Sequence, residues 1–164
     1  MEPADPSGTA RQASSNRLFL EDLTIGQRFI SGSHAVSAEE IKGFAAAYDP
    51  QPFHLDEAAA KRTLFGGLAA SGWHTAALTM RLNVETGLPI AGGIIGAGGE
   101  ISWPKPLRPG DSVHVESEVL EIVPSRSRPD RGIATIESRT LNQRGEIVQI
   151  LKAKLVVFRK EPTR

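Results

Sequence analysis

The sequence contains no cysteine and has no net charge, and both absences restrict what the protein can do. Its 164 residues include 19 basic and 19 acidic side chains, which cancel at pH 7. Without cysteine there can be no disulfide, no thiolate nucleophile and no cysteine-based metal site. Without an excess of one charge there is no broad field to attract nucleic acid or an anionic membrane. We therefore expect neither nucleic acid nor a membrane as a partner.

Long hydrophobic runs are missing as well. No apolar run approaches the roughly 20 residues that a membrane span requires. Residues 1–17 lack the apolar core of a signal peptide, and their Pro, Ser, Ala and Gly content without periodicity predicts a disordered tail. Residues 18–160 are long enough to form one domain with a buried core. The sequence thus predicts a cytoplasmic protein with a single folded domain.

The first half of the chain carries mainly helical patterns. A first strand is predicted over residues 27–36. Ser37 and Glu40 then have the spacing of a capping box, and apolar residues recur behind them with a helical period as far as Tyr48. Prolines follow directly and end this helix. A second, short helix is predicted over residues 56–62.

Residues 70–86 predict the longest helix of the chain. Apolar side chains are spread around almost its whole circumference, and charge occurs only at Arg81 and Glu85. A helix that is apolar on most sides is expected to be surrounded by protein rather than to lie on a surface.

The hydrophobic period changes to two after this helix, which predicts strands. The turns between them are short, and short turns join antiparallel neighbours. Four strands are expected in a meander, over residues 93–104, 111–123, 131–142 and 146–159. The predicted fold class is α+β, with an antiparallel sheet wrapped around the long helix.

Asp49 and His54 are the first candidates for chemistry. They lie five positions apart in a segment that also contains two prolines, which reduce the entropic cost of holding both side chains in one geometry. A carboxylate and an imidazole can together move protons near neutral pH. The alternative is structural, with Asp49 capping a turn and His54 hydrogen-bonded to it.

Gly72, at the start of the long helix, is the second candidate. Free N–H groups and the positive end of the helix dipole make a helix start suitable for a developing oxyanion, and glycine allows a carbonyl oxygen to approach the backbone. Alternatively, this glycine only lets the helix pack tightly against the sheet.

Together these segments resemble the MaoC-like dehydratase family, which includes the R-specific enoyl-CoA hydratases. Asp49, Pro52 and His54 match the family's hydratase motif, with Gln51 where asparagine is usual. Gly72 matches the glycine that opens the central helix, although a serine, Ser71, replaces the usual histidine before it. The segments 65–67 and 108–111 are also similar, and the resemblance covers about residues 18–159.

The resemblance implies a hot-dog fold and a hydratase or dehydratase that interconverts a 2-enoyl thioester and its (R)-3-hydroxyacyl thioester. It implies that Asp49 and His54 bind one water and that the Gly72 N–H polarises the thioester carbonyl. The residues predicted to bind substrate are neighbours of these three, namely Gln51, Ser71 and Trp73. The carrier is expected to be CoA or an acyl-carrier protein, and no metal or redox cofactor is expected.

Two other functions remain open on the same fold. Hot-dog thioesterases commonly use an acid on the central helix, and here that helix has none before Glu85. A non-catalytic subunit that only binds acyl thioesters is the other alternative. The exposed edges of a single wrapped sheet, together with the resemblance, predict a homodimer or a dimer of dimers.

Overall fold

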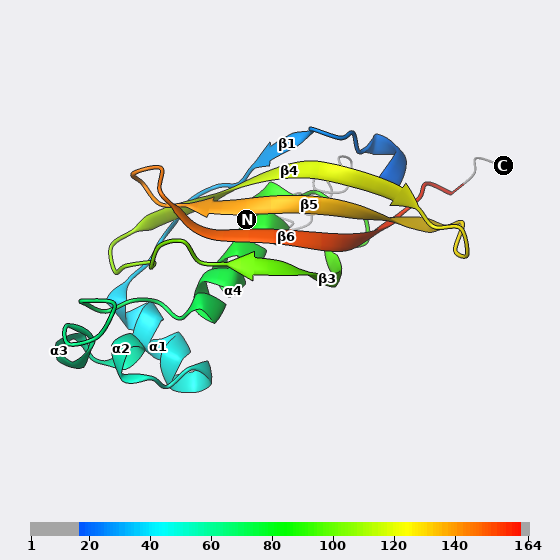
Figure 1. The fold of residues 1–164 in the computed structure, drawn as a ribbon. Helices are drawn as coiled ribbons and strands as arrows, with labels where there is room; N and C mark the ends of the chain where they lie inside the picture. Colours follow the sequence, from blue (N-terminus) through cyan, green and yellow to red (C-terminus); the bar gives the residue numbers. More distant parts are fainter. Residues whose placement is uncertain (1–16, 162–164) are drawn as a thin grey trace, which may run out of the picture.

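The computed structural model describes residues 17–161, in which an antiparallel sheet lies along a long helix, α4 (Gly72–Leu82) (Figure 1). The sheet has six strands in the order β1-β4-β5-β6-β3, with β2 paired to β4. Their bounds are β1 (Arg28–Ile30), β2 (His34–Ala35), β3 (Ile95–Ser102), β4 (Ser112–Pro124), β5 (Arg131–Leu141) and β6 (Ile147–Phe158). The predicted α+β class is confirmed. The predicted tail lies outside the described residues except for Arg17.

The strand expected over residues 27–36 is divided into β1 and β2. Both pair with β4, but they do not continue in one register. Ser31 lies at the break, where its N–H donates to the carbonyl of Val115 at 2.9 Å and its hydroxyl accepts from the Val115 N–H at 2.8 Å. A side-chain oxygen thus takes the place of a backbone acceptor, which is how a bulge interrupts a ladder without leaving a buried N–H unpaired.

The four later strands agree with their predicted bounds to within two residues, but the predicted meander is wrong for β3. β4, β5 and β6 are consecutive neighbours, whereas β3 pairs with β6 at the edge of the sheet. The connection from β3 to β4 spans residues 103–111 and contains three prolines. Because proline has no N–H to donate, this segment cannot close a tight hairpin.

Helix α1 (Ala38–Tyr48) begins as the sequence predicts. The Ser37 hydroxyl accepts from the Glu40 N–H at 3.1 Å, and the Glu40 carboxylate accepts from the Ser37 N–H at 2.9 Å. This reciprocal capping box satisfies two N–H groups that have no acceptor inside the helix. The helix ends just before Asp49, as the two prolines predict.

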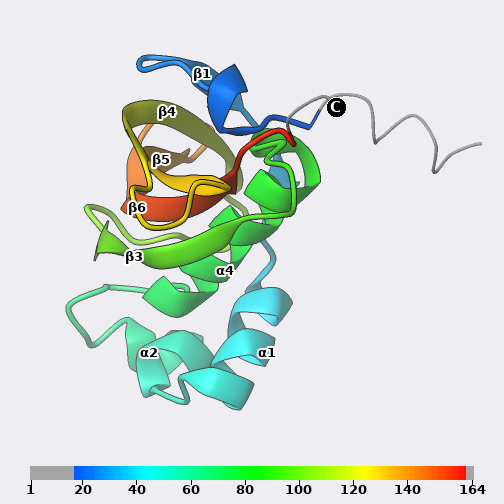
Figure 2. The same cartoon turned by 90° about the vertical axis from the view of Figure 1, so that its right-hand side faces the viewer.

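Two short helices follow, α2 (Pro52–Leu55) and α3 (Glu57–Ala60). The segment between Asp49 and His54 is therefore not only a stiff loop, because Pro52 occupies the first position of α2, where a missing N–H costs nothing. α3 is shorter than the helix predicted over residues 56–62. Helices α1 to α3 gather beyond the start of α4, away from the sheet (Figures 1 and 2).

Helix α4 starts two residues later than predicted and continues as a π-helical turn, Asn83–Gly87. It is not surrounded by protein within the described chain. His74, Leu78 and other residues of one side are buried, but Trp73 is 60% exposed, as are large parts of Met80 and Val84 on the outer side. The expectation of an enclosed helix is therefore wrong for the single chain. The apolar residues on the outer side of α4 are exposed, and only the opposite side is buried.

The side of α4 that faces the sheet is polar. Thr75, Thr79 and Asn83 follow one another at four-residue spacing and are all buried. Their partners include Ser138, Thr140 and Gln149. Apolar residues fill the core on either side of this polar seam, in one cluster that includes Ile41, Leu78, Leu107 and Val113 and another that includes Leu20, Ile90, Val119 and Ile136.

Candidate active site

Asp49 and His54 contact each other directly at the end of α1 and in α2. The His54 Nε2 lies 3.3 Å from the Asp49 Oδ2, and the two side chains are 5% and 16% exposed. Asp49 is the C-cap of α1, and His54 belongs to α2, so two helix ends hold the pair. The predicted proximity of the two side chains is confirmed.

The other ring nitrogen of His54 has a different partner. Nδ1 lies 2.6 Å from the carbonyl oxygen of Ala69. A carbonyl oxygen can only accept, so Nδ1 carries a hydrogen and a neutral imidazole then has its lone pair on Nε2. Nε2 and the Asp49 carboxylate are two acceptors that face each other, and one water can donate a hydrogen to each.

Asp49 is held by two further donors. The Ser71 hydroxyl donates to Oδ2 at 2.6 Å, and the Gln51 amide donates to Oδ1 at 2.6 Å. Burial raises the pKa of Asp49, but the hydrogen bonds from Ser71 and Gln51, together with His54 when its ring is protonated, lower the pKa below its usual value. The carboxylate is therefore ionised at neutral pH.

Gly72 is the first residue of α4, where a backbone N–H has no acceptor within its own helix. The cap residue Ser71 accepts from the next N–H, that of Trp73, at 3.2 Å. A Cβ at position 72 would approach the indole of Trp103 to 2.6 Å, so only glycine fits here. The close-packing explanation for Gly72 is thus confirmed, and it does not conflict with a role for its N–H.

A cavity of about 240 Å³ adjoins this group and opens to solvent. His54 and Gly72 both line it, while Asp49 does not. Of the two proposed proton carriers only His54 lines the cavity, and Asp49 adjoins it through its contact with the His54 Nε2. The remaining lining residues are Phe65, Ala70, Thr75, Trp103, Lys105, Pro106 and Leu107.

The three predicted substrate-binding residues are not among those that line the cavity. Ser71 is fully buried and, like Gln51, donates to Asp49. Trp73 projects from the outer side of α4, and its ring meets Trp103 edge to face with centroids 5.5 Å apart. Sequence adjacency to the motif identified these residues, but a helix start points successive side chains in different directions.

Sequence reasoning did not identify Phe65, Thr75 and Trp103 as lining residues. Their distances along the chain from the motif gave no local signal. Arg108, in the segment 108–111 that is similar to the family, binds backbone carbonyls. Its guanidinium donates to Gly67 at 2.9 Å, to Leu68 at 3.2 Å and to the carbonyl of Phe65.

The remaining histidines lie outside this group. His34 pairs with Glu40 at 2.9 Å and His114 with Glu116 at 3.1 Å. His74 is buried, and its Nδ1 has no hydrogen-bond partner among residues 17–161. Among residues 17–161, no three side chains of His, Asp or Glu are placed to hold a metal ion.

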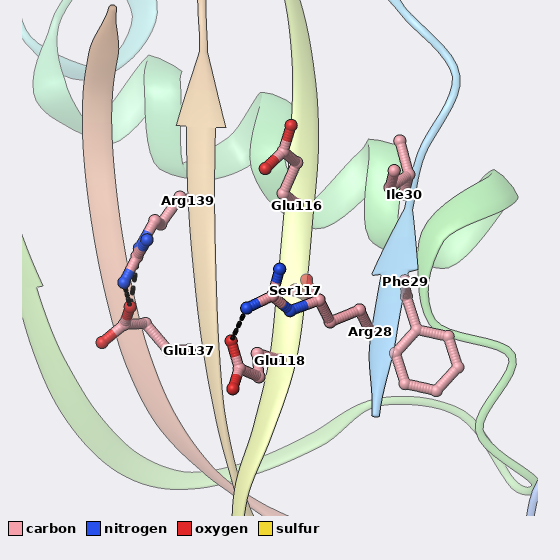
Figure 3. A pocket seen from close by; sticks show the side chains of 8 residues that line it. All are labelled: Arg28, Phe29, Ile30, Glu116, Ser117, Glu118, Glu137 and Arg139. Carbon is pink, nitrogen blue, oxygen red and sulfur yellow. Dashed lines mark hydrogen bonds and ion pairs between the residues drawn. The ribbon is translucent and has the colours of Figure 1, made fainter. Parts of the chain in front are cut away.

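A second hollow, of about 150 Å³, lies on the sheet face turned away from α4 (Figure 3). Its charged side chains pair with each other, Arg28 with Glu118 at 3.3 Å and Arg139 with Glu137 at 2.6 Å. Glu116, the remaining charged residue of the lining, pairs with His114 at 3.1 Å, and we assign the hollow no function.

Comparison with known proteins shows the family. Residues 22–140 match the family model of the MaoC like domain. The chain belongs to the MaoC-like dehydratase family. Its wrapped sheet and helix are the predicted hot-dog fold, and a solved MaoC-like dehydratase from Rhodospirillum rubrum superposes with a TM-score of 0.87 at 67% identity, over 88% of this chain and 99% of that one.

Two relatives that are similar in sequence to this MaoC-like chain have names that state an enzymatic activity. The 3-hydroxybutyryl-CoA dehydratase of Methylorubrum extorquens is 37% identical over 116 residues, which cover 68% of this chain and 69% of the relative. The (R)-specific enoyl-CoA hydratase of Aeromonas caviae is 33% identical over 131 residues, which cover 79% of this chain and 92% of the relative. In the described part of the chain, no helix is both long and apolar enough to cross a bilayer.

Proposed function

We propose that the protein adds water to a 2-enoyl thioester and, in reverse, dehydrates the (R)-3-hydroxyacyl thioester. The observation that carries this proposal is the pairing of His54 and Asp49. The His54 Nε2 and the Asp49 Oδ2 are two acceptors 3.3 Å apart, and the His54 ring also lines the cavity that Gly72 borders. Two acceptors suit a reaction in which one water must be oriented and deprotonated.

In the proposed reaction, His54 and Asp49 each accept one hydrogen of the water. His54 takes a proton at Nε2 as the water oxygen bonds to C3 of the substrate, and the C2=C3 π electrons move toward the thioester carbonyl. The His54 imidazolium then gives this proton from Nε2 to C2, the thioester carbonyl is restored, and the catalytic pair returns to its starting state. Asp49 stays ionised throughout and stabilises the imidazolium, in keeping with its low pKa.

The Gly72 N–H would donate to the thioester oxygen, where negative charge develops in the transition state. A single donor of this kind is worth about 3 kcal/mol, because it is already oriented before the reaction. The names of the relatives from Methylorubrum extorquens and Aeromonas caviae, a dehydratase and a hydratase, support the same reaction in its two directions.

The thioesterase alternative finds less support. α4 carries no carboxylate between Gly72 and Leu82. Glu85, in the π-helical turn, is bound to Arg81 at 2.9 Å and does not line the cavity. A binding-only subunit would not need an ionised aspartate buried against a histidine.

The carrier is proposed to be CoA or an acyl-carrier protein, and the assembly a homodimer or a dimer of dimers in the cytoplasm. The support for assembly is twofold. β3 is an edge strand paired only with β6 in the described chain, and the outer side of α4 beside it exposes apolar residues. Unpaired edges and contiguous apolar surface are both features that proteins cover.

The test is incubation of the purified protein with crotonyl-CoA. Loss of the conjugated-enoyl absorbance without release of free thiol is the expected result. Release of free thiol without addition of water to the double bond would mark a thioesterase instead. If a folded protein gives neither signal, the proposed reaction on this substrate is contradicted and the binding-only subunit is favoured.

A further inference from the structure

Trp103, Gln149 and Thr79 form a hydrogen-bonded group, here called the wall, at the end of the cavity beyond Gly72. The indole of Trp103 lies directly against Gly72 and lines the cavity. The indole N–H donates to the Gln149 Oε1 at 2.9 Å, and the Gln149 amide in turn donates to the Thr79 Oγ1 at 2.9 Å. Residues 72 and 79 of α4 are seven positions, or about 10 Å, apart along the helix. The wall therefore spans two turns of α4 on the side facing the sheet.

The members of this wall cannot move independently. Gln149, Thr79 and Thr140 are fully buried. The Thr79 hydroxyl lies 2.6 Å from that of Thr140 and 2.9 Å from the carbonyl of Thr75, so each buried polar group has a partner. A fully satisfied buried network is rigid, because moving one member leaves its neighbours unpaired in a medium of low dielectric constant. An apolar acyl chain could not displace it without that loss.

The space in front of the wall is small. A dry cavity of about 150 Å³ holds a benzene ring, that is, about six carbons. By the same proportion, 240 Å³ holds about ten non-hydrogen atoms. A four-carbon enoyl group with its carbonyl oxygen and sulfur uses about six of them, and the attacking water and the first carbons of the carrier use the rest.

We propose that Trp103, locked by Gln149, limits the substrate to a short acyl group of about four carbons. This inference rests on the proposed hydration reaction and names its substrate class. Trp103 is a specificity-determining residue in it: the ring blocks the path along α4 that a longer chain would follow past Thr75.

The experiment compares crotonyl-CoA with 2-octenoyl-CoA in the parent protein and in Trp103→Ala. The parent is expected to prefer crotonyl-CoA by at least about tenfold in kcat/KM, the discrimination that a poorly fitting methylene typically gives. Trp103→Ala should shift the ratio of the two kcat/KM values toward 2-octenoyl-CoA by at least about tenfold. Val123→Ala is the control, because Val123 is a half-exposed apolar residue of β4 that does not line the cavity, and its substitution should leave the ratio unchanged.

Trp103→Leu serves if the alanine variant fails to fold, since it retains an apolar side chain while removing the ring and its N–H. A smaller shift in the same direction is expected. If the parent uses both substrates equally, or if both folded Trp103 variants keep the parent's ratio, the wall is not the determinant and this inference fails while the proposed reaction stands. If the parent hydrates no enoyl thioester, the proposed reaction itself fails and this inference falls with it.

Discussion

The chemistry of His54 depends on which of its nitrogens holds a hydrogen, and a backbone oxygen decides this. Because Ala69 accepts from Nδ1, the proposed reaction uses Nε2 as the base, with Asp49 beside it on the same water. Asp49 is itself held from the opposite side by Ser71 and Gln51. Neither side chain can rotate away without breaking a short hydrogen bond, so the proposed pair is organised before substrate binds.

Asp49→Asn and His54→Ala are each expected to lower kcat for crotonyl-CoA hydration by about 10² to 10⁴-fold, the usual contribution of a positioned acid or base. Folding should be preserved in Asp49→Asn, since asparagine can still accept from the Ser71 hydroxyl. The double variant should be little worse than either single variant, because residues that act as one unit fail together. Steady-state kinetics with circular dichroism as the folding control provides the measurement. Near-normal turnover in Asp49→Asn would contradict the assignment.

His74 is a buried titratable residue that the proposed reaction does not use. It stacks on Phe44 with ring centroids 4.8 Å apart, and its Nδ1 is buried without a partner. Burial lowers the pKa of His74, while Glu40 opposes this shift and His34 adds to it. The folded state therefore holds a neutral imidazole at a pH where the unfolded chain, with an ordinary pKa of about 6.5, begins to bind a proton.

Linkage then predicts that His74 weakens the fold as the pH falls below about 6.5, because the unfolded state binds more protons there. His74→Phe should be stabilising by about 1 kcal/mol at pH 8, where it removes a buried unpaired polar atom. Its advantage over the parent should grow at about pH 5.5, since phenylalanine does not titrate. Urea unfolding at the two pH values measures both effects. The control is His114→Gln, on the exposed face; an equal change of pH dependence there would argue against His74 as the cause.

The elements themselves were predictable to different degrees, for physical reasons. The capping box at Ser37 and the period-two strands are local signals, so α1 and the bounds of β4, β5 and β6 follow from the sequence. The place of β3 beside β6 depends on pairing between segments about 55 residues apart, which no local pattern encodes. The contact of Asp49 with His54 was predictable from their motif, but the Ala69 carbonyl and the Trp103 ring reach the candidate site only through the tertiary fold.

The segment from α3 to α4 shows how a loop without regular structure is held in place. Arg108 donates to the carbonyls of Phe65, Gly67 and Leu68, and the carbonyl of the next residue, Ala69, accepts from His54. The planar fork of the guanidinium spreads its donors over two nitrogens, which here reach three carbonyls, whereas the donors of a lysine share a single nitrogen. This loop is thus ordered by one side chain from the β3–β4 connection.

Arg108→Lys is therefore expected to lower the free energy of unfolding by about 1–3 kcal/mol, as partly buried carbonyls lose their donors. It should also lower kcat by about tenfold or more, because a loop shift of even about 1 Å displaces the oxygen that orients His54. Arg139→Lys, on the outer face of the sheet, is the matched control and should change neither quantity. Urea unfolding and crotonyl-CoA kinetics measure the two effects. A variant with parent-like stability and kcat would show that the loop orders itself without Arg108.

At the scale of the whole molecule, the single chain exposes an apolar helix surface and an open strand edge. The edge of β3 and the outer side of α4 meet, and three large apolar side chains on that side of the helix, Trp73, Met80 and Val84, are 60%, 41% and 54% exposed. They repeat at spacings of seven and four residues, which aligns them as one stripe along the helix. A helix stripe of this kind beside an open strand edge fits a second copy of the same chain, in which each copy covers the other's stripe.

Met80→Lys is accordingly expected to dissociate the proposed dimer, because association would bury an unpaired charge at the centre of the stripe. Light scattering at micromolar concentration should give twice the chain mass of 17.6 kDa for the parent and the single mass for the variant. Ile25→Lys is the control: Ile25 is 64% exposed but lies away from α4, before β1, and its substitution should leave the dimer intact. A parent that scatters as a monomer, or a Met80→Lys protein that keeps the parent's mass, would place the interface elsewhere, since only a surface that is covered in the assembly makes its residues sensitive to charge.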